Sequence, residues 1–416
     1  MRIAHISDLH LGKQLYGFSL IEDQAFILDK IVSILDEKKV ETLLIAGDIY
    51  DKNIPSIDGI KLFRKFLNDL VKKQIKVLVI SGNHDSDERL TFGSEFMSVH
   101  NLYFSKIYDG KIEPVQLKDE FGNINFYLLP FLKQSEVKHF FPDEKISDYN
   151  DVLNVAIKNL KINKNERNVI LSHQAIINAK RCDSEESIIG MVETVSASIY
   201  EDFDYVALGH IHTPQKITDR IIYCGSPLKY SVSEIQKDKT LPIIELGEKK
   251  QNDAKNKAST TSELGTRNEV STTNEAENKS KESSTFDEKC ELKIEYVPLT
   301  PQRDVREIKG KYDEILTASK NDPYNKNDYI NVILTNENQI LDAMSCLREI
   351  YPNILQLSYE NSQTKNDFYT EDIDLKLKSS PIEIFAEFFE NRSGKALTEE
   401  QQNFMQNLIE KIWTEN

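Results

Sequence analysis

The chain has 416 residues, of which 39% are hydrophobic, and its formal net charge at pH 7 is −16. This length and apolar content suffice for a large core and for more than one domain. The acidic balance argues against a simple cationic nucleic-acid binder, although a local basic strip or a bound metal could still hold phosphates. The charge therefore leaves the substrate class open.

The sequence offers no sign of a membrane span or a disulfide framework. No apolar run approaches the roughly 20 residues that cross a bilayer, and residues 1–5 enter a strand instead of opening a signal peptide. We therefore expect a cytoplasmic protein without membrane association. The cysteines form no Cys-x-x-Cys pair, which favours packing roles over zinc or disulfide chemistry for Cys182, Cys224, Cys290 and Cys346.

The first predicted strand, residues 2–7, delivers two polar side chains at its end. Asp8 and His10 lie two residues apart, so an extended segment aims both the same way. Apolar residues then recur at helical spacing over residues 22–38, which predicts a crossover helix. A second strand follows at residues 42–46. Together these elements predict a βαβ unit and a parallel sheet.

The second and third strands also end in polar side chains. Asp48 and Asp51 follow the second strand, and a helix over residues 57–70 leads to a third strand that ends at Asn83, His84 and Asp85. Ligands of open α/β sheets sit at the carboxyl ends of strands. An ordinary Asn/Gly turn could explain one such tetrapeptide, but not three successive strand ends of the same kind.

Two later strands complete the pattern. Residues 169–171 lead to His173, and residues 205–208 lead to His210 and His212. A mixed oxygen and imidazole set suits Mn or Fe, or less specifically Zn, and seven ligands are too many for one ion. A carboxylate can bridge two ions about 3.5–4 Å apart, which together can drive an in-line phosphoryl displacement. The sequence thus predicts a two-metal hydrolase with these candidate ligands: Asp8, His10, Asp48, Asn83, His173, His210 and His212.

Residues 90–97 are apolar and aromatic, with Phe92 and Phe96 one helical turn apart. Core packing is the simpler interpretation of this segment. The alternative is a homodimer face, formed together with the helix at residues 57–70.

The motifs resemble those of the calcineurin-like metallophosphoesterase superfamily. The resemblance rests on Asp8-x-His10, Gly47-Asp48-x-x-Asp51, Gly82-Asn83-His84-Asp85, His173 and Gly209-His210-x-His212. Within the superfamily, residues 8–12, 202–210 and 225–231 are similar to DNA-repair nuclease subunits that act with an ABC-type ATPase.

This resemblance implies roles for individual residues. A first Mn²⁺ would be held by Asp8, His10, Asp48 and His212, and a second by Asp48, Asn83, His173 and His210, with Mg²⁺ or other divalent metals as substitutes. His84 would act on the leaving oxygen at the scissile phosphate. The resemblance further assigns imidazole-orienting roles to Asp51 and Asp85.

The resemblance also implies an activity and partners. The expected activity is 3′-to-5′ exonuclease on duplex DNA and endonuclease on hairpins or single strands, in DNA repair, recombination and replication. The chain would form a homodimer within a heterotetramer, and ATP would bind the partner, because residues 393–396 lack a complete phosphate-loop motif. A phosphomonoesterase or protein phosphatase with the same metal chemistry is the rival interpretation. A metal-free scaffold protein would be the alternative if some of the expected metal ligands were missing, but the set is complete.

We expect an α/β protein in which a metallophosphoesterase β-sandwich core flanked by helices is followed by a small α+β capping domain and C-terminal helices. The core spans residues 1–246, and residues 247–289 form a low-complexity, disordered insert. Strands at 292–297, 329–334 and 355–359 and helices at 305–316 and 339–348 predict a β-α-β-α-β capping domain at 290–379.

Residues 380–416 carry two predicted helices with apolar stripes. These stripes either pack internally or bind the ATPase partner. The first stripe comprises Ile382, Phe385 and Phe389, and the second comprises Phe404, Met405, Leu408, Ile409, Ile412 and Trp413.

Overall fold

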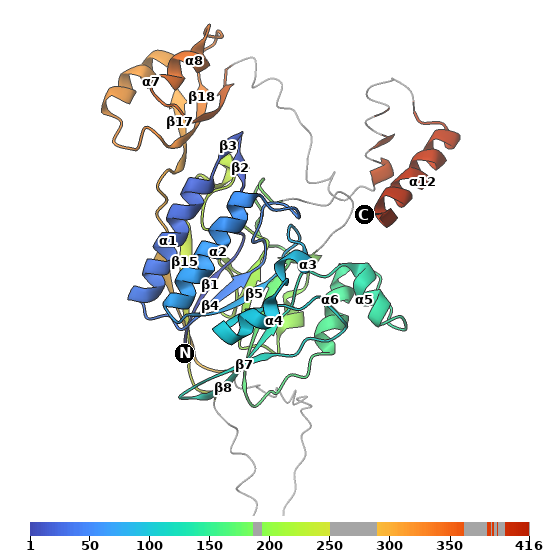
Figure 1. Cartoon of the computed structure of the whole chain (residues 1–416). Coiled ribbons are helices and arrows are strands. Elements are labelled where there is room, and N and C mark those ends of the chain that lie inside the picture. The colour runs from blue at the N-terminus through green and yellow to red at the C-terminus, as the bar shows by residue number, and fades with distance from the viewer. Residues whose placement is uncertain are drawn as a thin grey trace, which may run out of the picture.

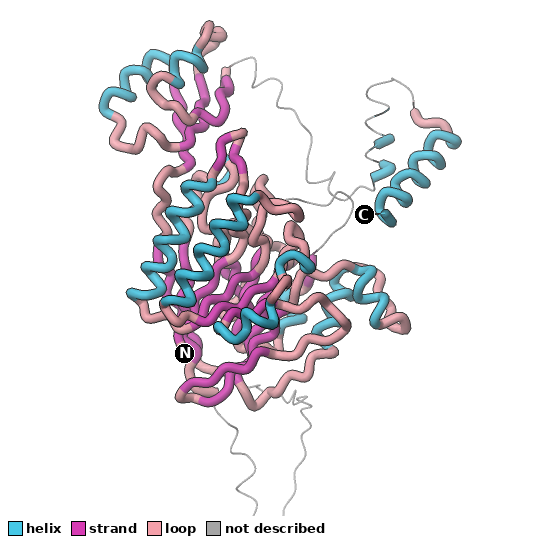
Figure 2. Tube along the Cα trace, in the orientation of Figure 1, coloured by secondary structure: helices cyan, strands magenta, loops and turns pink. Residues whose placement is uncertain are grey.

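The computed structural model describes residues 1–185, 194–249, 289–361, 381–383, 385, 386, 389 and 396–415. Two six-stranded sheets form the centre of the molecule, and helices cover their outer faces (Figures 1 and 2). The prediction of a β-sandwich core flanked by helices is confirmed. Most of the expected insert lies outside the described residues, and of the first expected C-terminal helix the structure describes residues 381–383, 385, 386 and 389 as helical.

The first sheet has the order β16-β15-β1-β4-β5-β6. Four strands run parallel, as the βαβ pattern predicts: β1 (Arg2–Ile6), β4 (Thr42–Ala46), β5 (Lys76–Ile80) and β6 (Leu102–Phe104). Two antiparallel strands complete it: β15 (Thr240–Leu246) and β16 (Leu292–Pro298). The helices that cover it are α1 (Ile21–Glu37) and α2 (Ile57–Lys72), and a hairpin, β2 (Gln14–Leu15) and β3 (Phe18–Ser19), precedes α1.

The second sheet has the order β13-β14-β12-β9-β8-β7. Its strands are β7 (Val115–Asp119), β8 (Gly122–Leu128), β9 (Arg167–His173), β12 (Tyr205–Gly209), β13 (Gln215–Lys216) and β14 (Ile221–Tyr223), with α5 (Gln134–Phe140) and α6 (Tyr149–Lys158) outside. The segments that connect these strands along the chain contain further short elements: α3 (Asp87–Leu90), α4 (Ser94–Met97), η1 (Ser98–His100), β10 (Ala175–Ile176), β11 (Thr194–Val195), η2 (Ala197–Tyr200) and η3 (Val232–Glu234).

The period of two along each strand builds the layers. Leu44 packs between the two sheets, while Leu43 and Ile45 on the same strand pack under the helices. Both faces of the central strands are therefore buried, which is why they read as continuous apolar runs. The sandwich also brings the carboxyl end of β4 close to that of β9, because these two strands contact each other across the layers.

A smaller module follows the core. Its three strands pair in parallel, and its elements are β17 (Val305–Gly310), α7 (Tyr312–Ala318), η4 (Ser319–Asn321), β18 (Tyr329–Leu334), α8 (Ala343–Arg348) and β19 (Ile354–Tyr359). We call residues 301–361 the cap. Beyond it, the described part of the C-terminus contains α12 (Glu399–Glu415).

Two predictions for this module are wrong. The helix expected at residues 305–316 begins only at Tyr312, because residues 305–310 gain β18 as a parallel partner and this pairing overrides the helical spacing. The strand expected to open the capping domain, at 292–297, is β16, which pairs with β15 in the core sheet along its whole length. Among the described residues, no helix is long and apolar enough to cross a membrane.

Candidate metal centre

The predicted ligands occupy the ends of five strands, and several of them have unusual backbone conformations. Asp8, His10, Asp48 and His210 have φ angles of 54°, 43°, 53° and 91°. Residues other than glycine rarely adopt a positive φ. Such a strained backbone conformation persists where several surrounding contacts hold it in place. Here the first two loops hold each other, since the amides of Asp8 and His10 donate to the carbonyls of Gly47 and Asp48 over 3.0 Å.

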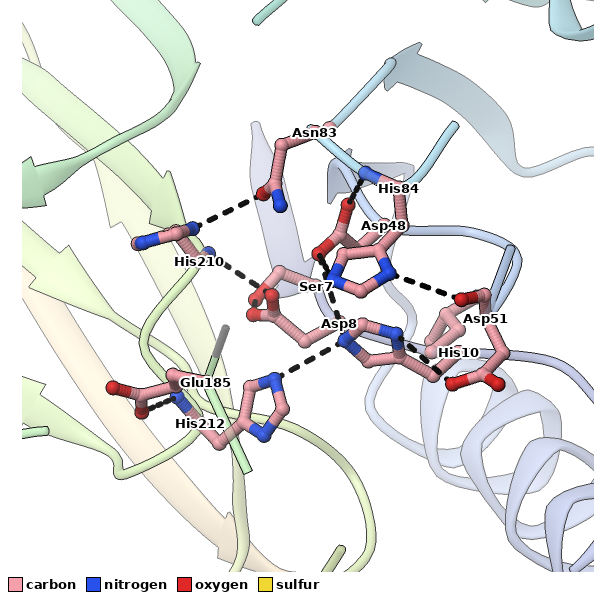
Figure 3. Close-up of polar contacts among 12 residues, drawn as sticks. Ser7, Asp8, His10, Asp48, Asp51, Asn83, His84, Glu185, His210 and His212 are labelled. Atoms are coloured by element: carbon pink, nitrogen blue, oxygen red, sulfur yellow. Dashed lines mark hydrogen bonds and ion pairs between the residues drawn. The ribbon is translucent and has the colours of Figure 1, made fainter. Parts of the chain in front are cut away.

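The fold brings the side chains of the first expected donor set close together. His10 Nε2 lies 3.1 Å from His212 Nε2 and 3.5 Å from Asp48 Oδ2 (Figure 3). Ligand atoms of Asp8, His10 and His212 all lie within 4.8 Å of one another. All four side chains are buried. They therefore form one compact set of nitrogen and oxygen donors.

The second donor set adjoins the first. Asn83 Oδ1 lies 3.1 Å from both His173 Nε2 and His210 Nδ1. His173 Nε2 is in turn 3.2 Å from Asp48 Oδ2, the oxygen that also faces His10. One carboxylate oxygen thus belongs to both sets.

Hydrogen bonds fix which imidazole nitrogen points into the centre. His173 Nδ1 donates to the carbonyl of Ala46 over 2.8 Å, so its Nε2 is left for a ligand role. The Ser184 hydroxyl donates to Glu234 over 2.7 Å, and His212 Nδ1 can then donate to Ser184 Oγ over 2.7 Å. Both imidazoles are held in the tautomer that directs Nε2 at Asp48 or His10.

The electrostatics fit divalent cations. Burial lowers the pKa of His10 and of His210 well below the usual value, which keeps both imidazoles in the neutral form that binds metals. Burial also acts to lower the pKa of His173, but the adjacent Asp48 carboxylate outweighs it and raises the pKa to about 9. Without a metal, Asp48 therefore favours the charged form of His173, which must lose a proton when a cation binds. Converging imidazole nitrogens and carboxylate oxygens, without thiolates, are the donor chemistry of hard or borderline divalent ions.

His84 lies at the rim of the two sets. Its amide donates to Asp48 Oδ1 over 2.9 Å, and its Nδ1 lies 3.0 Å from the backbone carbonyl of Asp51. Its side chain is 12% exposed, and its Nε2 is 4.0 Å from Asp48 Oδ2. Ligand atoms of His10, Asp48 and His84 also lie within 4.8 Å of one another, so His84 directly adjoins both donor sets.

The two remaining carboxylates differ from each other. An Asp51 oxygen lies 3.8 Å from His10 Nδ1 and 2.9 Å from Lys13 Nζ, which is compatible with orienting an imidazole. Asp85 instead accepts hydrogen bonds from the backbone amides of Ile49, Tyr50 and Gly82. Burial, together with the Asp48 charge, raises the pKa of Asp85 to about 7. The expectation that Asp85 orients an imidazole is corrected, because its carboxylate supports backbone.

Sequence reasoning missed the residues that hold the His212 loop. Glu185 Oε1 accepts from the His212 amide over 2.8 Å, and Lys239 Nζ donates to the His212 carbonyl over 2.8 Å and to Glu234 over 2.5 Å. In the sequence, the motif at residues 225–231 was the one indication of this support for the His212 loop. A Cβ at Gly225 would lie 2.5 Å from the His212 carbonyl oxygen, so this position requires glycine.

Comparison with known proteins places the chain in a family. A calcineurin-like phosphoesterase family model matches residues 1–214, and the SbcD_C model, described as the type 5 capsule protein repressor C-terminal domain, matches residues 301–393. The chain is 32% identical over 417 residues to the SbcD subunit of the nuclease SbcCD from Staphylococcus epidermidis, covering 99% of both proteins. A crystal structure of a dimetal phosphatase from Danio rerio is 14% identical, with a TM-score of 0.36, covering 59% of this chain and 92% of that one. By its match to the family models and to nearly the whole length of the Staphylococcus protein, the chain belongs to the SbcD family of calcineurin-like phosphoesterases.

Proposed function

We propose that this chain is the nuclease subunit of an SbcCD-type complex and hydrolyses DNA phosphodiesters with two divalent cations. One observation carries the proposal: Asp48 Oδ2 faces His10 Nε2 and His173 Nε2, which belong to two adjacent donor sets. Two cations held this way would activate a water and stabilise both ends of an in-line displacement. The first ion is assigned to Asp8, His10, Asp48 and His212, and the second to Asp48, Asn83, His173 and His210.

His84 supplies the protein's own contribution to the chemistry. The Asp51 carbonyl accepts from Nδ1, which turns Nε2 toward the side of the centre where Asp48 lies. When the imidazole is doubly protonated, Nε2 also carries a proton, and from there it can donate a hydrogen bond to the leaving oxygen and transfer that proton to it, which leaves a neutral imidazole with its proton on Nδ1. Asp51 orients the first donor set through His10, and Asp85 keeps the loops of Asp48 and His84 together.

Manganese is the metal we propose. The combination of carboxylate, amide oxygen and imidazole ligands suits Mn²⁺, with Mg²⁺ and other divalent ions as substitutes. An equilibrium titration of the purified chain with Mn²⁺, Mg²⁺ and Zn²⁺ tests the order of affinity. Tighter binding with full activity on a metal other than Mn²⁺ would contradict the assignment.

DNA is the proposed substrate, and its duplex ends, hairpins and single strands are the proposed forms. The similar Staphylococcus protein is named as a nuclease, whereas a phosphomonoesterase or phosphoprotein phosphatase remains the rival with the same metals. The test is incubation with Mn²⁺ and either a labelled DNA hairpin, a labelled duplex or an aryl phosphate monoester. Cleavage of DNA is expected, and hydrolysis of the monoester alone would favour the rival.

An ABC-type ATPase of the SbcC kind is the proposed partner, since the Staphylococcus relative is named as one subunit of the nuclease SbcCD. The proposed contact is the C-terminal region, residues 380–416. On α12, Phe404 is 67% exposed and Leu408 is 38% exposed, which leaves apolar surface for a groove on the partner. Truncation after Ser379 should abolish co-purification with SbcC and leave Mn²⁺-dependent cleavage by the isolated chain intact. Retained association would assign these helices to internal packing.

A homodimer of two nuclease cores within a heterotetramer completes the proposal. Phe92 and Phe96 are 83% and 82% exposed, so the core-packing interpretation fails for both rings. The core at residues 1–246 together with β16 would carry the chemistry and the cap would supply the capping domain, and we place the protein in the cytoplasm.

A further inference from the structure

The cap and the core are joined by side chains of the core that are adjacent in sequence to residues contacting the loop of His10. Asp23, in the first turn of α1, is buried and receives two hydrogen bonds from Arg303, at 2.9 and 2.7 Å. Tyr329 of β18 donates to the same carboxylate over 2.8 Å. A bidentate Arg–carboxylate pair with a third donor is a geometrically specific link. It ties α1 to the cap.

The next residue along α1 points the other way, to the metal loop. Gln24 Nε2 donates to the carbonyl of His10 over 2.8 Å and to that of Leu9 over 3.2 Å. Its Oε1 accepts from the amide of Gly12 over 3.0 Å. This buried amide therefore fixes the loop that presents His10.

A second pair of adjacent residues repeats the arrangement. Lys229 Nζ donates to the Asp304 carboxylate over 3.0 Å and contacts the Val305 carbonyl at 3.4 Å, at the start of β17. Tyr230 donates its hydroxyl to the Leu9 carbonyl over 2.5 Å. Its ring meets the imidazoles of His10 and His212 edge-on, with centroids 5.6 and 5.8 Å away.

The two pairs are parts of one packed region. Leu9, Leu11, Tyr230, Val305 and Tyr329 belong to the same buried apolar cluster. Close-packed interiors transmit displacement, because they cannot deform without losing contacts. A shift of the cap that moves Asp23 or Lys229 must therefore shift or strain the neighbouring Gln24 or Tyr230.

We propose that Gln24 and Tyr230 are positioning residues of the first metal site and that the cap acts on this site through the joint of Asp23 and Lys229 with Arg303, Asp304 and Tyr329. This inference rests on the proposed function, because it requires that the first donor set binds a cation. It adds that cap position and cation affinity are linked. Such a link is reciprocal, so cation binding must also tighten the joint.

Calorimetric titration of the full chain with Mn²⁺ tests the link. Tyr230→Phe keeps the ring and removes the bond to Leu9, and we expect it to weaken the first site by about tenfold or more. Arg303→Gln, on the cap, should weaken the same site by about fivefold. The second site should keep its affinity in both. The double variant should lose less than the product of the two factors, because both changes interrupt one link.

Arg306→Gln is the matched control. Arg306 is also a cap arginine, but its ion pairs, with Asp322 and Asp328, stay within the cap. The affinity of the first site for Mn²⁺ in Arg306→Gln should equal that in the unaltered chain. Amide exchange gives the reciprocal measurement: Mn²⁺ should slow exchange around Val305 and Tyr329 in the unaltered chain and not in Tyr230→Phe.

The outcomes separate the two proposals. Unchanged first-site affinity in Arg303→Gln, in a chain that binds Mn²⁺, would overturn the link to the cap, and an equal loss in Arg306→Gln would do the same by indicating general damage to the cap. Failure of the unaltered chain to bind Mn²⁺ would overturn the proposed function and this inference with it.

Discussion

Asp48 and Asp85 each bind the loop that carries the other. The Asp48 carboxylate accepts from the amide of His84, and the Asp85 carboxylate accepts from the amides of Ile49 and Tyr50. This reciprocal arrangement joins the ends of β4 and β5. It explains how a loop residue can hold its ligand atom in place, since each loop is fixed by a buried side chain of its neighbour.

Replacing Asp85 with alanine should therefore destabilise the fold as well as the site. Three backbone amides lose their acceptor, two of them buried and the third, that of Tyr50, partly buried, and each buried unsatisfied donor costs about 1–3 kcal/mol. We expect the unfolding free energy to fall by about 3 kcal/mol or more. Urea denaturation with chelator present measures it. Asp109→Ala, which removes an exposed carboxylate, is the control, and equal stability of the two variants would contradict the role of Asp85.

Replacing Asp48 with alanine should affect both cations at once. Its Oδ2 faces both His10 and His173, so each donor set becomes incomplete. We expect Asp48→Ala to bind fewer than two equivalents of Mn²⁺ in calorimetry. Asp58→Ala, on the exposed start of α2, should bind two. Two full equivalents in Asp48→Ala would refute the shared ligand.

Replacing His84 with alanine should separate metal binding from catalysis. His84 lies beside the donor sets, and a proton donor to the leaving oxygen contributes about 10²- to 10⁴-fold to a rate. We expect His84→Ala to retain two Mn²⁺ by elemental analysis while its DNA cleavage falls by about that factor. The exposed His100→Ala should keep both properties. Loss of bound Mn²⁺ in His84→Ala would instead make His84 a ligand.

The sequence was sufficient to locate the site because of how parallel sheets are built. The strands β1, β4, β5, β9 and β12 are buried on both faces and each contains a short, mainly apolar run, so their ends could be placed closely. Ligands that directly follow such runs must meet at one edge. The donor pattern could thus be predicted without any knowledge of the packing.

What the sequence could not supply depends on contacts between distant residues. Tyr230 and Leu9 are 221 positions apart, and nothing local marks either as a partner of the other. The strand at Val305–Gly310 was mistaken for a helix because Val305 and Ile308 fit helical spacing, and only the pairing with β18 decides its state. Gly310, unfavourable inside a helix, was the signal against it.

The last prediction concerns the apolar face around α3 and α4. Arg89 donates to both the carbonyl and the side chain of Asn53, which joins the loop before α2 to α3. Both joined segments carry exposed apolar side chains, each more than two-thirds exposed: Ile54 before α2 and Ile57 at its start, and Phe92, Phe96 and Val99 after α3. Grouped exposed apolar side chains of this kind are characteristic of a protein interface.

We therefore expect the chain to be a dimer at micromolar concentration and the double variant Phe92→Glu/Phe96→Glu to be a monomer. Buried aromatic anchors contribute about 2 kcal/mol or more each to an interface, and a buried glutamate without a partner adds a desolvation cost. Sedimentation equilibrium measures the mass of both. Leu341→Glu, which changes an equally exposed apolar residue on the cap, should leave the dimer intact. A monomeric unaltered chain, or a dimer that survives both glutamates, would show that this face does not join two copies.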